Sequence, residues 1–239
     1  MSRYLVLFAR EPRREALAKG FGPSGQDLFV TFARGWLDLA RRARAQMVIA
    51  TPPEDRCGWR RRLPEAAEAL WITQAGSTFG DRLEGVARQA ARLPGAAVLV
   101  GGDVAPSEPA VVAAFAALES GAQAVVGPAP DGGVSLVALR AEDADLLRAV
   151  RPRQRRVAER LRRGLEDRGR LVIRVGSATD IDGLASLASF ERGLGPCATR
   201  ALVREILNAA TTRARPAREV PRFLILSNPT SPRAPPKAA

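Results

Sequence analysis

Seven short apolar runs are spaced along the chain, and most of them are bounded by glycine, proline or charged residues. Runs of this length between turn-forming residues are typical of buried β-strands. We therefore predict strands at residues 4–9, 47–51, 70–73, 97–100, 124–126, 134–139 and 171–175.

Segments with helical periodicity lie between most of these strands. In residues 25–45, Leu28, Phe32 and Trp36 recur every four positions, so one broad stripe faces a core. Residues 79–93 and 107–118 show the same spacing, the latter with Ser107 as a capping residue. Strands that alternate with helices predict an α/β fold in which a mainly parallel sheet forms the middle of three α/β/α layers.

In such sheets ligands bind beyond the carboxyl ends of the strands. We therefore expect the chemistry in the loops that follow Ala9, Val100 and Val126. One domain is predicted over residues 1–208, and the Arg- and Pro-rich segment 209–239 is typical of an extended or disordered tail. Its apolar residues 223–226 fit a strap on the same domain, an edge strand or a contact with a partner.

The order of charge at the start of the chain indicates neither a signal peptide nor a membrane span. The basic residues follow the first apolar run, and no run of about 18 apolar residues occurs. We expect a cytoplasmic protein. Histidine is absent, and Cys57 and Cys197 are far apart, which excludes Cys/His zinc sites and an imidazole base.

The formal net charge of +12 raises the question of nucleic-acid binding. However, all basic residues except Lys19 and Lys237 are arginine, in a chain rich in Ala, Gly and Pro, and only 5% of the residues are aromatic. No RRM, KH or helix-turn-helix signature is present. We therefore expect anionic small molecules, rather than nucleic acid, as partners.

Residues 98–106, VLVGGDVAP, predict a candidate metal ligand. A buried strand ends in two glycines and Asp103, and Gly102 lets the backbone approach a ligand closely. A carboxylate at this position suits a hard cation such as Mg²⁺ at nucleotide phosphates. The alternative is that Asp103 only caps the next turn.

Residues 74–83, QAGSTFGDRL, join a strand to a helix, with Gly80 and Arg82 near the helix start. A helix start offers N–H groups to an anion, and Arg82 adds positive charge. Alternatively, Arg82 pairs with an acidic neighbour on the surface.

Residues 127–134, GPAPDGGV, place Asp131 before Gly132 and Gly133. These three residues are candidates for the site, but Asp-Gly is also the strongest signal for a simple hairpin turn.

Asp180 and Asp182 are two residues apart, so both carboxylates lie on one side of an extended segment and could share a cation. Alternatively, either residue caps the helix expected from about Gly183.

Taken together, FAREP, QAGSTFGDRL, VLVGGDVAPSEP, VVGPAPDGGVSLVAL and DIDGLASL resemble, in this order, a bacterial family of nucleotide-diphospho-sugar transferases. Its members are associated with radical-SAM enzymes or arsenosugar pathways. The resemblance spans roughly residues 3 to 190. It implies a GT-A fold, Mg²⁺ or Mn²⁺ as cofactor, Asp103 as a metal ligand and Asp182 as a second one.

This chain departs from the family in its first loop. The family pattern PxPGxVKTRL, whose Lys and Arg would meet nucleotide phosphates, is replaced by PRREALAKGF at residues 12–21. Lys19 is shifted, Arg10 is a further candidate for the phosphates, and Gly20 and Gly22 predict a pliable loop. The family's DGGY is DGGV here, which removes a ring that could stack on a ligand.

The resemblance favours glycosyl transfer from a nucleotide sugar to a small-molecule acceptor. Because the sequence contains no histidine, the general base must be a carboxylate, and Asp131 is the first candidate. The alternatives are nucleotidyl transfer from an NTP and a non-catalytic binding or scaffold protein of the same fold. A homodimer is left open.

Overall fold

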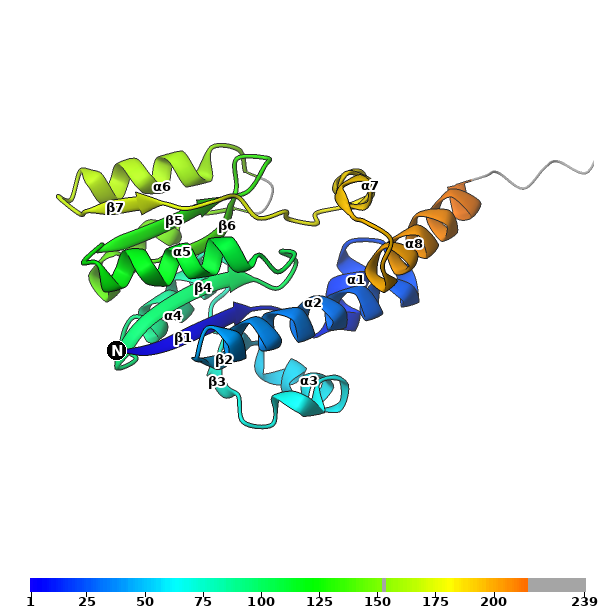
Figure 1. Ribbon diagram of the computed structural model, residues 1–239, viewed down its shortest axis with the longest axis horizontal. Helices are drawn as coiled ribbons and strands as arrows, with labels where there is room; N and C mark the ends of the chain where they lie inside the picture. Colours follow the sequence, from blue (N-terminus) through cyan, green and yellow to red (C-terminus); the bar gives the residue numbers. More distant parts are fainter. Residues whose placement is uncertain (152–153, 215–239) are drawn as a thin grey trace, which may run out of the picture.

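The computed structural model describes residues 1–151 and 154–214 of the chain. A seven-stranded sheet has the order β3-β2-β1-β4-β6-β5-β7 (Figure 1). Only β6 is antiparallel to its neighbours β4 and β5, so the sheet is mainly parallel as predicted. All seven predicted strands are confirmed: β1 (Ser2–Phe8), β2 (Ala45–Thr51), β3 (Leu70–Thr73), β4 (Gly95–Gly101), β5 (Ala124–Pro128), β6 (Val134–Ala138) and β7 (Val172–Arg174).

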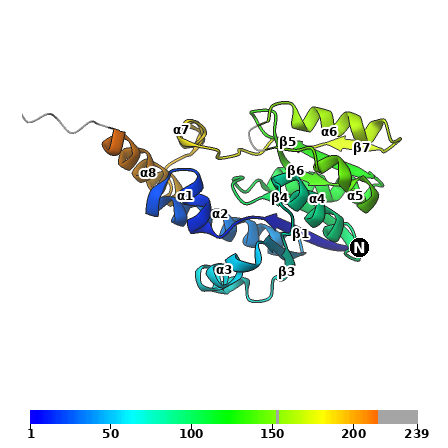
Figure 2. The ribbon, with the colours of Figure 1, turned by 180° about the vertical axis from the view of Figure 1, so that it is seen from behind.

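Helices cover both faces of the sheet, which gives the expected three layers (Figures 1 and 2). One core cluster joins the strands to α2, α3 and α5, and another joins the opposite face to α4, α6 and the 3-10 turn η3. The helices that flank the sheet are α2 (Gly22–Arg42), α3 (Arg56–Arg62), α4 (Phe79–Ala90), α5 (Glu108–Glu119) and α6 (Val157–Glu166), with short turns η1 (Pro53–Asp55), η2 (Pro64–Ala66) and η3 (Ala141–Leu147).

Three further helices, α1 (Pro12–Ala18), α7 (Leu184–Gly193) and α8 (Ala198–Ala214), lie beyond the carboxyl end of the sheet. They pack on the amino-terminal half of α2, which is long enough to leave the sheet, and we call this group the helical extension (Figure 1). Its core contains Phe21, Phe29, Phe32 and Ile181. Burial of these apolar side chains holds the extension against the edge where ligands are expected.

Two expectations for the chain's helices are corrected. Residues 12–21 are not a pliable loop, because Pro12–Ala18 form α1 and α2 begins at Gly22. A proline in the first turn and the Glu11 carboxylate, which accepts from the Arg14 amide, start this helix. Ser107 precedes α5 but makes no side-chain capping bond.

The carboxyl-terminal segment is helical for longer than its composition indicates. Helix α8 continues through residue 208 to Ala214, while residues 223–226 lie outside the described part of the chain. Among the described residues, none of the helices combines the length and the apolar character needed to cross a bilayer.

Candidate metal centre and substrate cleft

Asp103 follows β4 at the carboxyl end of the sheet, where close packing fixes its loop. The Gly102 amide donates to the Phe8 carbonyl at 2.9 Å, and a Cβ on Gly102 would lie 2.3 Å from that of Ala9. Only glycine therefore fits between β1 and this loop. On the other side, the Trp36 indole N–H donates to the Val104 carbonyl at 3.0 Å.

Asp180 and Asp182 reach Asp103 through a short antiparallel pairing. The Ala105 amide donates to the Thr179 carbonyl at 2.8 Å, and the Ile181 amide donates to the Asp103 carbonyl at 3.0 Å. Ile181 is fully buried in the core of the helical extension. Because side chains alternate along an extended segment, its two aspartate neighbours turn the other way, toward Asp103.

The three carboxylates form a cluster suited to a divalent cation. One oxygen from each of Asp103, Asp180 and Asp182 lies within 4.8 Å of the others. A buried Asp180 oxygen, Oδ1, has no hydrogen-bond partner among the described residues. Burial, together with the charges of Asp103 and Asp182, raises the pKa of Asp180 to about 8. Hard oxygen donors gathered in this way fit Mg²⁺ or Mn²⁺.

Asp182 does not cap α7, since the cap residue is Gly183. The amides of Asp182 and Gly183 instead donate to the Ser186 hydroxyl at 2.9 and 3.1 Å. This bonding fixes the backbone of Asp182 beside the cluster.

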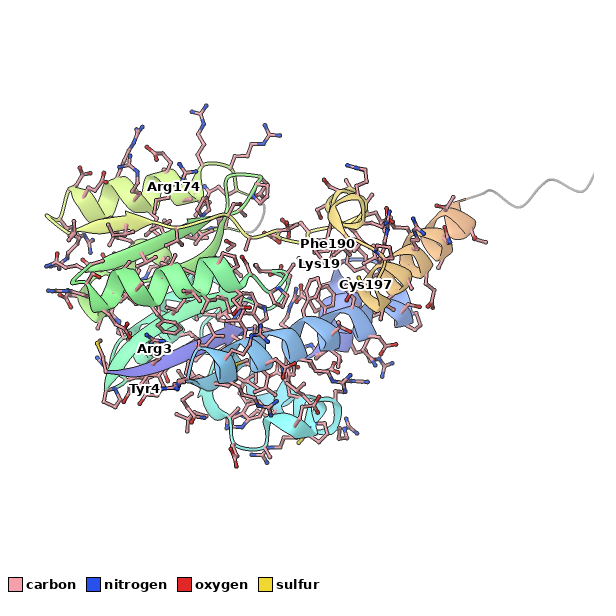
Figure 3. The ribbon with its side chains drawn as sticks, viewed as in Figure 1. Arg3, Tyr4, Lys19, Arg174, Phe190 and Cys197 are labelled. Atoms are coloured by element: carbon pink, nitrogen blue, oxygen red, sulfur yellow. The ribbon has the colours of Figure 1, made fainter. Side chains whose placement is uncertain are left out.

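Lys19, at the end of α1, reaches into the carboxylate cluster. Its Nζ donates to Asp103 Oδ2 at 2.5 Å and to Asp182 Oδ1 at 3.0 Å, and only 8% of its side chain is exposed. Figure 3 shows it between the sheet and the helical extension. Burial alone would lower the pKa of Lys19, but the charges of Asp103, Glu15 and Asp182 outweigh it and raise the pKa.

Glu15 links the two basic candidates of the first segment. Its carboxylate accepts from Arg10 Nε at 2.8 Å and lies 3.6 Å from Lys19 Nζ. Glu15 is buried, whereas the Arg10 side chain is 41% exposed. The buried carboxylate therefore holds both cations at the edge of the site, a role that we did not predict from sequence.

A cleft of about 470 Å³ lies beside the carboxylates and is large enough for a small-molecule ligand. We call it the substrate cleft. Its wall includes Asp103, Asp180, Asp182 and Lys19, and further basic side chains from three other segments: Arg10, Arg82 and Arg151. Apolar side chains of β4, β6 and α4 line its interior, including Phe79, Leu83, Leu99 and Leu136.

The start of α4 contributes Arg82 to the substrate cleft but not Gly80. A Cβ on Gly80 would lie 2.1 Å from the Arg148 carbonyl oxygen, so this glycine permits close packing of α4 on the segment after η3. The Thr78 and Asp81 side chains cap each other's backbone N–H groups. The N–H groups of Thr78 and Asp81 at this helix start, which we expected to be available to an anion, are therefore already hydrogen-bonded.

Asp131, Gly132 and Gly133 form the turn of the hairpin between β5 and β6, which confirms the turn interpretation of this segment. The Gly133 amide donates to Asp131 Oδ1 at 2.8 Å. Asp131 and Gly133 also line the substrate cleft. This segment is therefore both the turn of the hairpin and part of the wall of the cleft.

The structure brings Arg10, Lys19, Arg82, Gly102, Asp103, Asp131, Gly133 and Asp182 of the predicted set to one cleft. Glu15, Asp180 and Arg151 join them. Asp180 had a sequence signal, its two-residue spacing from Asp182, whereas Glu15 lies in a charged segment without a motif.

Residues 36–152 match a family described as "Uncharacterized protein conserved in bacteria (DUF2064)". No curated protein matches the chain.

Solved structures share the fold. A "putative nucleotide-diphospho-sugar transferase" from Desulfovibrio desulfuricans G20 has a TM-score of 0.73 at 22% identity, over 89% of this chain and 98% of that one. An inositol-1-phosphate CTP transferase from T. maritima has a TM-score of 0.53 at 13% identity, over 86% and 96% of the two chains. A "Putative Glucose-1-Phosphate Thymidylyltransferase" from Bacillus anthracis has a TM-score of 0.54 at 12% identity, with the same coverage.

The resemblance stated from the sequence motifs is therefore confirmed: residues 36–152 match the bacterial DUF2064 family, and the chain has the fold of nucleotide-diphospho-sugar transferases.

Proposed function

We propose that this protein is a metal-dependent transferase that moves a glycosyl group from a nucleotide sugar to a small-molecule acceptor. The observation that carries the proposal is the joining of three carboxylates and Lys19 to a cleft with further basic side chains. An anionic diphosphate bound to a divalent cation needs both kinds of group, acidic side chains for the cation and basic ones for the phosphates. The fold, shared with nucleotide-diphospho-sugar transferases, supports the same conclusion.

Asp103, Asp180 and Asp182 would hold Mg²⁺ or Mn²⁺, which when bound neutralises charge on the diphosphate leaving group. Lys19 lies within reach of the same position and would bind a phosphate oxygen there. Arg10, Arg82 and Arg151 line the substrate cleft and supply further positive charge.

In the transfer step, the acceptor hydroxyl oxygen forms a bond to the anomeric carbon of the sugar. The bond from that carbon to the β-phosphate oxygen breaks, and its electron pair leaves with the nucleoside diphosphate. Asp131, which lines the cleft, takes the hydroxyl proton and becomes a neutral carboxylic acid. No histidine occurs in the sequence, so a carboxylate is the natural base.

Nucleotidyl transfer is the second candidate, because two solved structures of this fold are named as a CTP transferase and a thymidylyltransferase. In that reaction a sugar phosphate attacks the α-phosphate of an NTP, and pyrophosphate leaves. The carboxylate cluster and Lys19 would serve either reaction.

Calorimetry with Mn²⁺ and two ligand panels separates the candidates. We expect UDP-, GDP- and dTDP-sugars to bind more tightly than the matching NTPs, and binding to be lost in Asp103→Ala. Metal-dependent NTP binding, with pyrophosphate released when a sugar phosphate is added, would support nucleotidyl transfer instead. A protein that binds neither panel at millimolar ligand would be a non-catalytic member of the fold.

A further inference from the structure

A second cleft of about 820 Å³ lies beside the carboxylate cluster. We call it the α7 cleft. The tip of the β5–β6 hairpin and residues 179–183 form part of its wall, and α7 forms the rest. It shares Asp131, Asp180 and Asp182 with the substrate cleft, so the two clefts meet at the candidate metal centre.

The two clefts differ in charge. Every charged side chain among the described residues that line the α7 cleft is acidic: Asp131, Asp180 and Asp182. The remainder of the wall is neutral and includes Thr179, Leu184, Ser189 and Phe190. The substrate cleft shares these three aspartates and is also lined by Asp103 and Glu15, but it has four basic side chains as well: Arg10, Lys19, Arg82 and Arg151. A ligand with its own phosphate or carboxylate would therefore find basic partners in the substrate cleft and none along the α7 cleft.

We infer that the α7 cleft binds the acceptor, and that this acceptor bears a hydroxyl group and no negative charge. The inference rests on the proposed glycosyl transfer and names the substrate class of its second substrate. An uncharged or cationic polyol meets the carboxylates of this wall without like-charge repulsion. A sugar phosphate, the acceptor that nucleotidyl transfer requires, would find no cationic side chain along this wall and would lie beside the carboxylate of Asp131, which is not one of the candidate metal ligands.

The position of Asp131 connects this cleft to the transfer step. Asp131 is exposed at the hairpin tip and lines both clefts, so a hydroxyl bound in the α7 cleft lies on the side from which the base takes the proton. The opposite wall is held in place, because the Phe190 ring packs edge-on against Phe32 with centroids 5.7 Å apart. A preformed wall of this kind favours one acceptor shape.

Ser189→Arg tests the charge of the cleft, because Ser189 is exposed and lines it. Ser120→Arg is the matched control. It adds the same charge at the exposed residue that follows α5, and Ser120 lines neither cleft. Nucleoside diphosphate release would be measured at saturating donor with paired acceptors: glucose and glucose 6-phosphate, glycerol and glycerol 3-phosphate, and glucosamine. Donor affinity and melting temperature are measured on the same samples.

In the wild type we expect transfer to the neutral or cationic member of each pair, and little to the phosphorylated member. Ser189→Arg should lower the rate of transfer to neutral acceptors at least about tenfold. It should also reduce the ratio between the rates for the neutral and the phosphorylated member of each pair. Donor affinity should stay within about twofold, since the donor lies in the other cleft.

Preference of the wild type for phosphorylated acceptors would overturn the inference, as would equal effects of Ser189→Arg and Ser120→Arg. In both cases the donor still binds, so the proposed function stands. A wild type that binds no nucleotide sugar overturns the proposed function and this inference together.

Discussion

Asp103 and Asp143 both lie among charged side chains, but the charges around them are matched differently. Asp143 is fully buried and accepts from Arg170 Nε at 2.8 Å and from Arg168 at 3.4 Å. Around Asp103, three clustered aspartates face the single ammonium of Lys19, which also lies near Glu15.

The difference distinguishes a structural ion pair from a group of carboxylates that is suited to bind a cation. Two guanidinium groups compensate the buried charge of Asp143, and the bonds tie η3 to the segment before β7. In the carboxylate cluster negative charge exceeds positive charge, and an Asp180 oxygen lacks a partner among the described residues. An excess of partly buried carboxylates is costly, so its presence at the carboxyl end of the sheet favours a cation as a further partner.

The largest effect is expected for Asp103→Asn. Loss of one carboxylate from the cluster should lower the transfer rate about a thousandfold, because a bound metal contributes several kcal/mol to the transition state. The melting temperature should change little, since the change also relieves repulsion from Asp180 and Asp182. Steady-state assays and thermal melts measure both quantities. A variant that is unstable but still active would show that Asp103, like Asp143, has a structural role instead.

Asp143→Asn should show the opposite behaviour. Removal of the buried charge leaves Arg168 and Arg170 without their shared partner, and unfolding free energy should fall by about 3 kcal/mol. Mn²⁺ affinity should be unchanged, because Asp143 lies outside both clefts. Urea unfolding measures the change in unfolding free energy, and a metal titration measures the Mn²⁺ affinity. Weaker Mn²⁺ binding by the folded variant would contradict the separation of the two groups.

Lys19→Met tests the comparison by removing the positive charge beside Asp103 and Asp182. Lys19 bonds two of the three candidate metal ligands and would compete with a divalent ion for them. Without its charge the free protein should bind Mn²⁺ about tenfold more tightly, a change of about 1.4 kcal/mol, while nucleotide-sugar binding weakens. Electron paramagnetic resonance of free Mn²⁺ measures the first effect. Lys19→Arg, which keeps the charge, is the control, and equal Mn²⁺ affinity of Lys19→Met and wild type would refute the competition.

The strands and the ligand edge could be predicted because they depend on local patterns. Each strand is an apolar run between turn-forming residues, and the carboxyl end of a parallel sheet is a general binding site. Helix α1 was missed because its sequence, PRREALA, lacks a wide apolar stripe. Its Ala16 is buried in the apolar core that it shares with α2, α7 and α8, a tertiary contact that its own short sequence does not reveal.

The candidate site could be predicted only in part, because some of its features depend on local sequence and others on long-range contacts. The spacing of Asp180 and Asp182 is visible in the sequence, but their approach to Asp103 depends on a backbone pairing across more than seventy residues. Gly80 stands in a motif that resembles a ligand-binding segment, yet its close contact is with the Arg148 carbonyl. Such long-range contacts leave no local pattern to read.

The smallest effect is expected for Glu84→Gln, which tests a second balanced ion-pair group. The Glu84 carboxylate accepts from Arg148 at 2.6 and 3.0 Å and from Arg88 at 2.9 Å, and these bonds lower its pKa from the ordinary 4.5. The unfolded chain therefore takes up this proton at higher pH than the folded one. The stabilisation is complete above about pH 4.5 and is lost as the pH falls through the lowered pKa.

At pH 7 the variant should lose about 1 kcal/mol of unfolding free energy relative to wild type, and the difference should shrink as the pH falls below 4.5. Urea unfolding at several pH values measures this, with Glu68→Gln, an exposed position, as the control. A difference that stays constant into acid would mean that shape, rather than charge, makes Glu84 stabilising. Nucleotide-sugar binding should not change, because Glu84 lines neither of the two clefts.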